Sequence, residues 1–107
     1  MPNHSDQPPR EVVETPEYTA NYDDIIEKHS LAVVGPILTG LIEGIAKNPR
    51  AMDRTTGHIW MAKSKALGLT IPTFTIFFSI ESESTDNEQI LLLWIEENST
   101  TDEIMGH

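Results

Sequence analysis

The sequence contains no cysteine, which excludes disulfide bonds and any chemistry that needs a thiolate. It has no apolar run near the ~20 residues that a membrane-crossing helix requires. It has no glycine-rich phosphate loop, because Gly35, Gly40 and Gly44 lie in an apolar helical stretch rather than after a strand. The four histidines show no metal-ligand spacing. We therefore expect no metal, no cofactor and no membrane span.

The length of 107 residues predicts a single folded domain. Residues 1–10 are polar and contain no apolar signal region, so we expect a disordered leader there. Residues 99–107 are also polar and are expected to form a C-terminal tail. The fold should then occupy residues 11–98. These features together favour a cytoplasmic protein.

A first helix is predicted over residues 16–30. Thr15 is expected to cap it, with Pro16 at its first position and Glu17 in its first turn. Its apolar residues recur at the spacing of one helix face. These residues are Tyr18, Tyr22, Ile25 and Ile26.

A second helix is predicted from Leu31, with Ser30 as its cap, and Asn48-Pro49 should end it. Pro36 leaves two alternatives open: the helix begins near Pro36, or the proline kinks the first turns. The very short connection predicts that the two helices pack as a hairpin. The apolar stripe of the second helix consists of Val34, Ile37, Leu38, Leu41, Ile42 and Ile45.

Four strands complete the prediction. A short one lies around Val12 and Val13, and three longer ones cover residues 58–67, 71–80 and 90–97. The order β-α-α-β-β-β indicates an α+β fold, with the helical hairpin packed on one face of a small, mainly antiparallel sheet. The strand residues expected against the second helix are Phe74, Ile76 and Phe78.

Positive charge is scarce and unevenly placed. The chain has 17 acidic residues and seven Lys and Arg, giving a net charge of −10. Residues 44–80 nevertheless carry five cations and a single acid. If these cations converge near one sheet edge, they can focus an anionic ligand such as a phosphate. The other interpretation is ordinary solvated charge, with lysine protecting an edge strand. The five cations are Lys47, Arg50, Arg54, Lys63 and Lys65.

Several segments together resemble the RelE/ParE superfamily of bacterial toxins. They are "EVVETPEY" before the first helix, "KNPR" after the second, "TTGHIW" before a strand, and the strands "TFTIFFSI" and "ILLLWIEEN". The resemblance covers residues 11–98. It implies a small toxin that a partner antitoxin wraps and neutralises. RelE-like members act at the ribosome and cut mRNA, using cations and acid–base groups around one phosphate.

The resemblance assigns catalytic roles to Lys63 and Lys65, which lie two apart on one strand. We expect them to act with help from Arg50, Arg54 or His58. Lys47 and Arg50 would contact RNA. If the two lysines act together, we expect them on the solvent-exposed concave side of the sheet, near Arg50 or Arg54, and not on the helix-covered side. Without the resemblance, His58 next to Gly57 is typical of a turn residue.

The sequence also departs from the RelE-like pattern. RelE-like toxins carry an arginine in the third strand, but the equivalent position here lies near Thr75 and holds no arginine. They also carry a basic residue after the last strand, where this chain has Glu96 and Glu97. A ParE-type toxin that binds gyrase, without nuclease activity, is therefore an alternative. An acidic inhibitor or immunity-like protein is another. It would present the carboxylates of Glu81, Glu83, Asp86 and Glu88.

Overall fold

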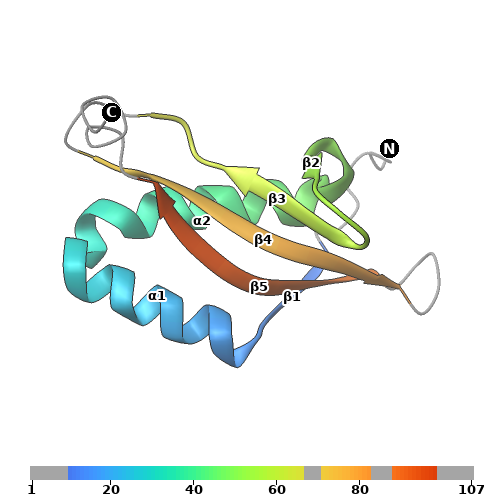
Figure 1. Cartoon of the computed structure of the whole chain (residues 1–107), viewed down its shortest axis with the longest axis horizontal. Helices are drawn as coiled ribbons and strands as arrows, with labels where there is room; N and C mark the ends of the chain where they lie inside the picture. The colour runs from blue at the N-terminus through green and yellow to red at the C-terminus, as the bar shows by residue number, and fades with distance from the viewer. Residues whose placement is uncertain (1–9, 67–70, 83–87, 99–107) are drawn as a thin grey trace, which may run out of the picture.

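The computed structural model of the chain describes residues 10–66, 71–82 and 88–98. Two helices and a five-stranded mixed sheet make up this part, which confirms the α+β class (Figure 1). All of the predicted tail and all of the predicted leader except Arg10 lie outside the described residues. In chain order the elements are β1 (Glu11–Glu14), α1 (Pro16–His29), α2 (Leu31–Lys47), the 3-10 helix η1 (Pro49–Ala51), β2 (Asp53–Arg54), β3 (Ile59–Lys63), β4 (Thr73–Ser82) and β5 (Glu88–Asn98).

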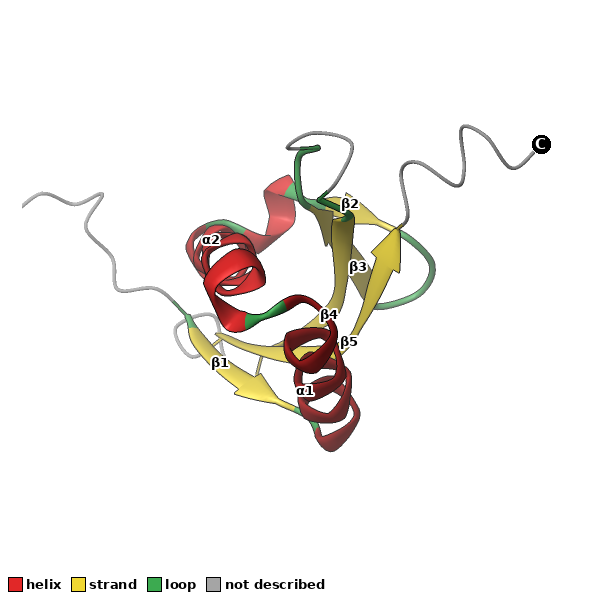
Figure 2. Ribbon diagram, turned by 90° about the vertical axis from the view of Figure 1, so that its left-hand side faces the viewer, coloured by secondary structure: helices red, strands yellow, loops and turns green. Residues whose placement is uncertain are grey.

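The sheet has the strand order β1-β5-β4-β3-β2. The first strand pairs in parallel with the last, and the other neighbouring pairs are antiparallel, so the mainly antiparallel sheet is confirmed. The two-residue strand β2 was not predicted. The strand expected over residues 58–67 ends at Lys63, so its prediction is wrong for residues 64–66, and residue 67 lies outside the described residues. Figure 2 shows the strands wrapping around α2.

The caps of the two helices differ. Thr15 accepts a hydrogen bond from the backbone N–H of Tyr18 at 3.3 Å, as its place before Pro16 predicted. Ser30 alone separates the helices, and its φ of 89° turns the chain between them. Its side chain makes no capping hydrogen bond, so only its position was predicted correctly.

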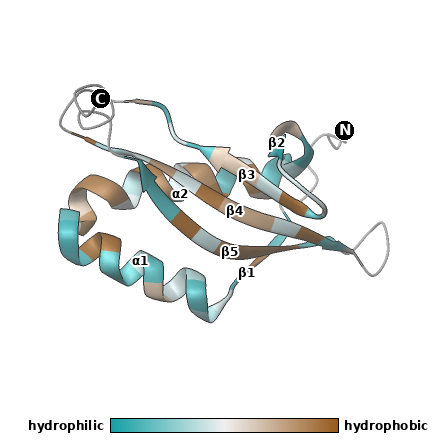
Figure 3. Ribbon diagram, viewed as in Figure 1, coloured by the Kyte–Doolittle hydropathy of each residue, from teal (hydrophilic) through white to brown (hydrophobic). Residues whose placement is uncertain are grey.

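Pro36 lies inside α2, which begins five residues earlier at Leu31. The alternative in which the helix begins near the proline is therefore wrong. Because proline has no N–H, the carbonyl of Ala32 lacks its helical donor. Ala32 and Pro36 are both exposed residues, so the missing hydrogen bond lies on the outer side of the helix rather than in the core. Although α2 is largely apolar (Figure 3), no described helix is long and apolar enough to cross a membrane.

The core lies between α2 and the central strand β4. Val34 and Leu38 on the helix and Phe74 and Ile76 on the strand are fully buried. This confirms the predicted packing, because the apolar stripe of a helix must cover the apolar face of a sheet. The helix residues at the margins of the stripe are half-buried against the same cluster. They are Ile37, Leu41 and Ile42.

The first helix protects an open edge of β5. Because β1 pairs only with the first half of β5, the second half would present unpaired backbone groups. Thr15 Oγ1 donates to the carbonyls of Leu92 and Leu93 at 2.8 and 3.2 Å. Asn21 Oδ1 accepts from the N–H of Ile95 at 3.1 Å. The side chains of Thr15 and Asn21 thus form hydrogen bonds with backbone groups of β5 that a neighbouring strand would otherwise satisfy.

A β-bulge interrupts the pairing of β4 with β5. Phe77 lies opposite Trp94, whereas the next residue, Phe78, lies opposite Leu92. Leu93 is therefore an extra residue in β5. The insertion shifts the alternation of β5, so residues after it point to the face opposite the one that an unbroken strand would give them.

The fully buried position of Leu38 leads to a stability prediction. Leu38→Ala should lower the free energy of unfolding by ~2–5 kcal/mol, because it removes apolar contacts and leaves a cavity. Thr39→Ala, at the exposed next position, should change it by less than ~0.5 kcal/mol. Urea denaturation of both variants measures the difference. Equal midpoints would contradict the packing of α2 on the sheet.

Candidate functional site

The two candidate catalytic lysines do not form a pair on one strand. Lys63 is the last residue of β3 and lies opposite Thr75 of β4. Lys65 lies beyond the strand end, where no alternation fixes its direction. Between them, Ser64 turns inward, and its Oγ accepts from the N–H of Phe74 at 2.9 Å. Both lysines are exposed, but their expected shared position on a sheet face is wrong.

Lys63 faces away from the helices, on what we call the open face of the sheet. Its neighbour Ala62 is buried in the core, so the alternation of the strand points Lys63 outward. Thr75 lies beside it and accepts a hydrogen bond from Asn98 Nδ2 at 3.0 Å. Glu96 lies opposite Thr75 on β5 and is exposed. The expected solvent-exposed side is therefore confirmed for Lys63. The expected concave shape of this side is wrong, because the strands curve around α2 and the open face is the convex one (Figure 2).

Arg54 lies on the other face of the sheet. It is paired with Trp60, and its guanidinium carbon stands 5.6 Å from the centre of the indole ring. The same guanidinium donates two hydrogen bonds to the carbonyl of Gly57, at 3.0 and 3.1 Å. The expectation that Lys63 lies near Arg54 is wrong, because their strands point them to opposite faces. His58 is exposed in the turn that Gly57 begins.

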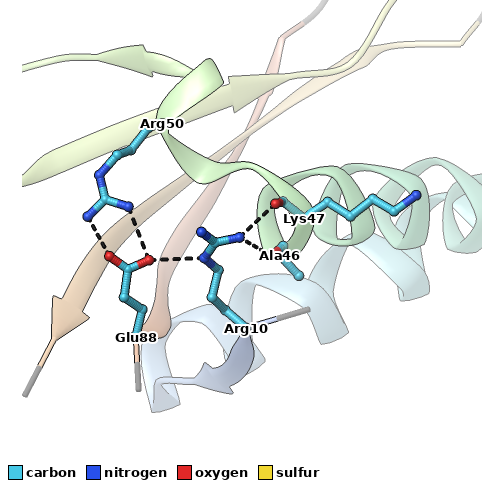
Figure 4. Close-up of polar contacts among 5 residues, drawn as sticks. All are labelled: Arg10, Ala46, Lys47, Arg50 and Glu88. Carbon is cyan, nitrogen blue, oxygen red and sulfur yellow. Dashed lines mark hydrogen bonds and ion pairs between the residues drawn. The ribbon is translucent and has the colours of Figure 1, made fainter. Parts of the chain in front are cut away.

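Arg50 forms an ion pair at the far end of the sheet from Lys63. Its two terminal nitrogens contact both carboxylate oxygens of Glu88, at 3.1 and 2.6 Å (Figure 4). Glu88 begins β5 opposite Ser82, the last residue of β4, whereas Lys63 borders the start of β4. The predicted convergence of the five cations is therefore not observed. Lys47 is exposed at the end of α2.

Arg10 holds Glu88 from the other side. Its Nε donates to a Glu88 oxygen at 3.0 Å, and its Nη1 donates to the carbonyl of Lys47 at 2.7 Å (Figure 4). A weaker contact of 3.4 Å reaches the carbonyl of Ala46. A cation at the C-terminal end of a helix satisfies carbonyls that have no helical donor. This cluster therefore joins α2, the start of β1 and the start of β5.

The two arginines shift the ionisation of Glu88. The hydrogen bond from Arg50, followed by that from Arg10, lowers the pKa of the Glu88 carboxyl to about 2. The same bond raises the pKa of the Arg50 guanidinium above its ordinary value. With its side chain only 13% exposed, Glu88 is held as a carboxylate between two cations. Arg50 is thereby neutralised by a structural partner.

The open face carries an apolar band two rows wide. One row joins Trp94, Phe77 and Met61 as directly opposed residues. The other row runs from Val13 and Leu91 to Ile59 and passes through the buried Ser79 of β4. The rings of Trp94 and Phe77 stack with their centres 4.6 Å apart and 15° between their planes. The band residues are all half-buried, and no described helix covers them. We call Val13, Ile59, Met61, Phe77, Leu91 and Trp94 the open-face band.

Comparisons with protein-family models, with curated proteins and with solved structures found no match for this chain. The described residues also contain no group of three or more histidine, aspartate or glutamate side chains that could hold a metal ion.

No local pattern in the sequence indicates the cluster around Glu88. Arg10 ends the expected leader, and Glu88 precedes the strand expected over residues 90–97, so neither lies in a local structural pattern. Only the pairing of β1 with β5 brings them together, 78 positions apart. Arg10 and Glu88 carry opposite charges at the beginnings of two strands that pair in parallel. This relation predicts their ion pair only after the pairing of the strands is known.

The depressed pKa of Glu88 gives a pH prediction. The pKa of the Glu88 carboxyl is about 2 in the folded protein, below the ~4.3 of a glutamate in an unfolded chain. The ionised carboxylate therefore stabilises the fold fully above pH ~4.3, and this stabilisation is lost as the pH falls toward about 2. Glu88→Gln should therefore lower the free energy of unfolding at pH 7, and its difference from wild type should shrink below about pH 4. Glu43→Gln, at an exposed position of α2, is the matched control. A constant difference across this range would contradict the ion pairs.

Proposed function

We propose that the chain is a divergent RelE/ParE-like toxin component of a toxin–antitoxin system that acts by binding another protein rather than by cutting RNA. The separation of its candidate cations carries this proposal. Lys63 lies on the open face, Arg54 lies against Trp60 on the other face, and Arg50 is bound to Glu88. Cleavage of RNA develops charge at a single phosphate, so the stabilising cations must surround one point.

Overall charge also supports binding to protein. Ribonucleic acid is a polyanion, and affinity for it grows with the number of phosphates that Lys and Arg neutralise. A chain of net charge −10 opposes such contacts at long range. The open-face band instead offers stacked aromatic rings, which are enriched where proteins meet other proteins.

The order of elements supports the family part of the proposal. One strand, two helices and a set of antiparallel strands follow each other as the resemblance leads one to expect. A cognate antitoxin and a gyrase-type target are the partners that this proposal implies. The ribonuclease alternative draws support from Lys63, an exposed cation beside the hydrogen-bonded pair Thr75 and Asn98.

Expression in a bacterial host that lacks the partner tests these functions. We expect wild type and the double variant Lys63→Ala/Lys65→Ala to arrest growth equally, because the proposed action does not use these lysines. The double variant should fold normally, with a change below ~0.5 kcal/mol, since both side chains are exposed. Growth, pulse-labelled protein synthesis, transcript ends and plasmid supercoiling are recorded together.

The control is Glu17→Ala/Glu43→Ala, which removes two exposed charges from the helices. Loss of both arrest and transcript cleavage in the lysine variant alone would establish the ribonuclease alternative. No arrest with any of the proteins, at equal soluble expression, would refute the toxin proposal and favour the acidic inhibitor.

A further inference from the structure

Two large aromatic side chains of the open-face band lie on the sheet face that no described helix covers. Sheets of α+β proteins bury one face under helices, and the other is usually polar. Here Trp94 and Phe77 stack on that second face, with Met61 beside them on β3. Leu91 and Ile59 lie in the next row, on either side of the buried Ser79. Such an arrangement is typical of a surface that binds another molecule.

Carboxylates lie around the band. At one end Glu96 accepts a hydrogen bond from Trp94 Nε1 at 3.3 Å, and at the other Glu81 accepts from Ser79 at 3.0 Å. Glu11 continues the row of Glu81, since both flank the same residue of β5. These three glutamates have no ion-pair partner among the described residues.

The charge on this face is therefore negative. Asp53 on β2, opposite Met61, adds a fourth carboxylate, and Lys63 beside Thr75 is the cation on the described strands of this face. A ligand that fits the open face must present apolar groups in its centre and positive charge at its margins. Complementary charge of this kind gives an interface its register and its selectivity.

The dimensions of the band fit one helix. Rows of side chains on one sheet face are about 7 Å apart, and a helix is about 10 Å wide. From β1 to β3 the band crosses about 14 Å, since neighbouring strands are ~4.8 Å apart, and this equals about ten residues of helix. We propose that the open face binds a basic, amphipathic helix of a partner protein. The inference rests on the protein-binding part of the proposed function.

This occupant is favoured over a second copy and over a nucleic acid. A second copy would bring the acidic margins of two chains together, each of net charge −10. Single-stranded nucleic acid can stack bases on aromatic rings, but its phosphates would meet the carboxylates of Glu81 and Glu96. A basic helix satisfies both the apolar centre and the charged margins.

The probe is a synthetic peptide of about 18 residues, long enough to exceed the ~12–15 residues below which an isolated helix is marginal. Leucine repeats at i, i+3, i+4 and i+7, and Lys and Arg fill the flanking positions. A second peptide keeps the leucines and replaces the cations with Glu. Fluorescence anisotropy should show binding of the basic peptide only, with affinity that decreases as salt is added.

Charge-matched variants of the full chain test the location. Glu81→Lys/Glu96→Lys reverses two carboxylates of the open face, whereas Glu17→Lys/Glu43→Lys makes the same net change on the helices. The first should weaken binding of the basic peptide by about tenfold or more, because attraction becomes repulsion at both margins. The second should leave the affinity within about twofold. Circular dichroism verifies that both variants fold.

The two tryptophans report on opposite faces. Trp60→Phe leaves Trp94 as the only indole, and Trp94→Phe leaves Trp60 on the helix side. The basic peptide should shift the emission of Trp94 and leave that of Trp60 unchanged. A shift of Trp60 alone, equal weakening by both charge variants, or equal binding of the acidic peptide would overturn the proposal.

The competing occupants give distinct results. A dimer in sedimentation experiments that Glu81→Lys/Glu96→Lys strengthens would assign the open face to a second copy. Quenching of Trp94 by oligothymidylate, with no response to the basic peptide, would assign it to nucleic acid. Growth arrest without peptide binding would overturn this inference while the proposed function stands, and peptide binding without arrest would do the reverse.

Discussion

The parallel pairing of β1 with β5 is the interaction on which the rest of the fold depends. It joins the two ends of the described chain and closes the sheet beside α2. It also places Thr15 against β5, so that the cap of α1 holds two strand carbonyls. Glu88 sits where this pairing begins, between Arg10 and Arg50, and fixes the end of α2 to the same corner. One contact of long sequence separation thus positions both helices.

Local patterns in the sequence predicted most of the elements and the core. The spacing of apolar residues in α2 and the alternation in β4 identified which residues are buried, because these periods follow directly from helix and strand geometry. The end of β3 was not predictable in this way. Lys65 would have to pair with Thr73, the first residue of β4, and the sheet pairing ends before it. Strand length depends on the partner strand, which a local pattern does not contain.

The candidate site shows why charge clustered along a sequence need not cluster in space. Alternation along strands and the turn between β2 and β3 send Arg54 and Lys63 to opposite faces. Arg50 finds its partner 38 positions away in Glu88. The sequence therefore identified exposed cations but not their neighbours. Whether a cation can bind an anionic ligand depends on how close the carboxylates of the chain lie to it, and sheet topology determines these distances.

The extra residue Leu93 determines what both faces of the sheet present. In an unbroken strand Trp94 would follow Leu92 onto the helix side, and Ile95 would point outward. The bulge reverses both, so Ile95 enters the core and Trp94 stacks on Phe77. Because this part of β5 is apolar on every position from Ile90 to Ile95, its composition does not reveal the change of phase. A single inserted residue thus completes the core and creates the aromatic centre of the open face.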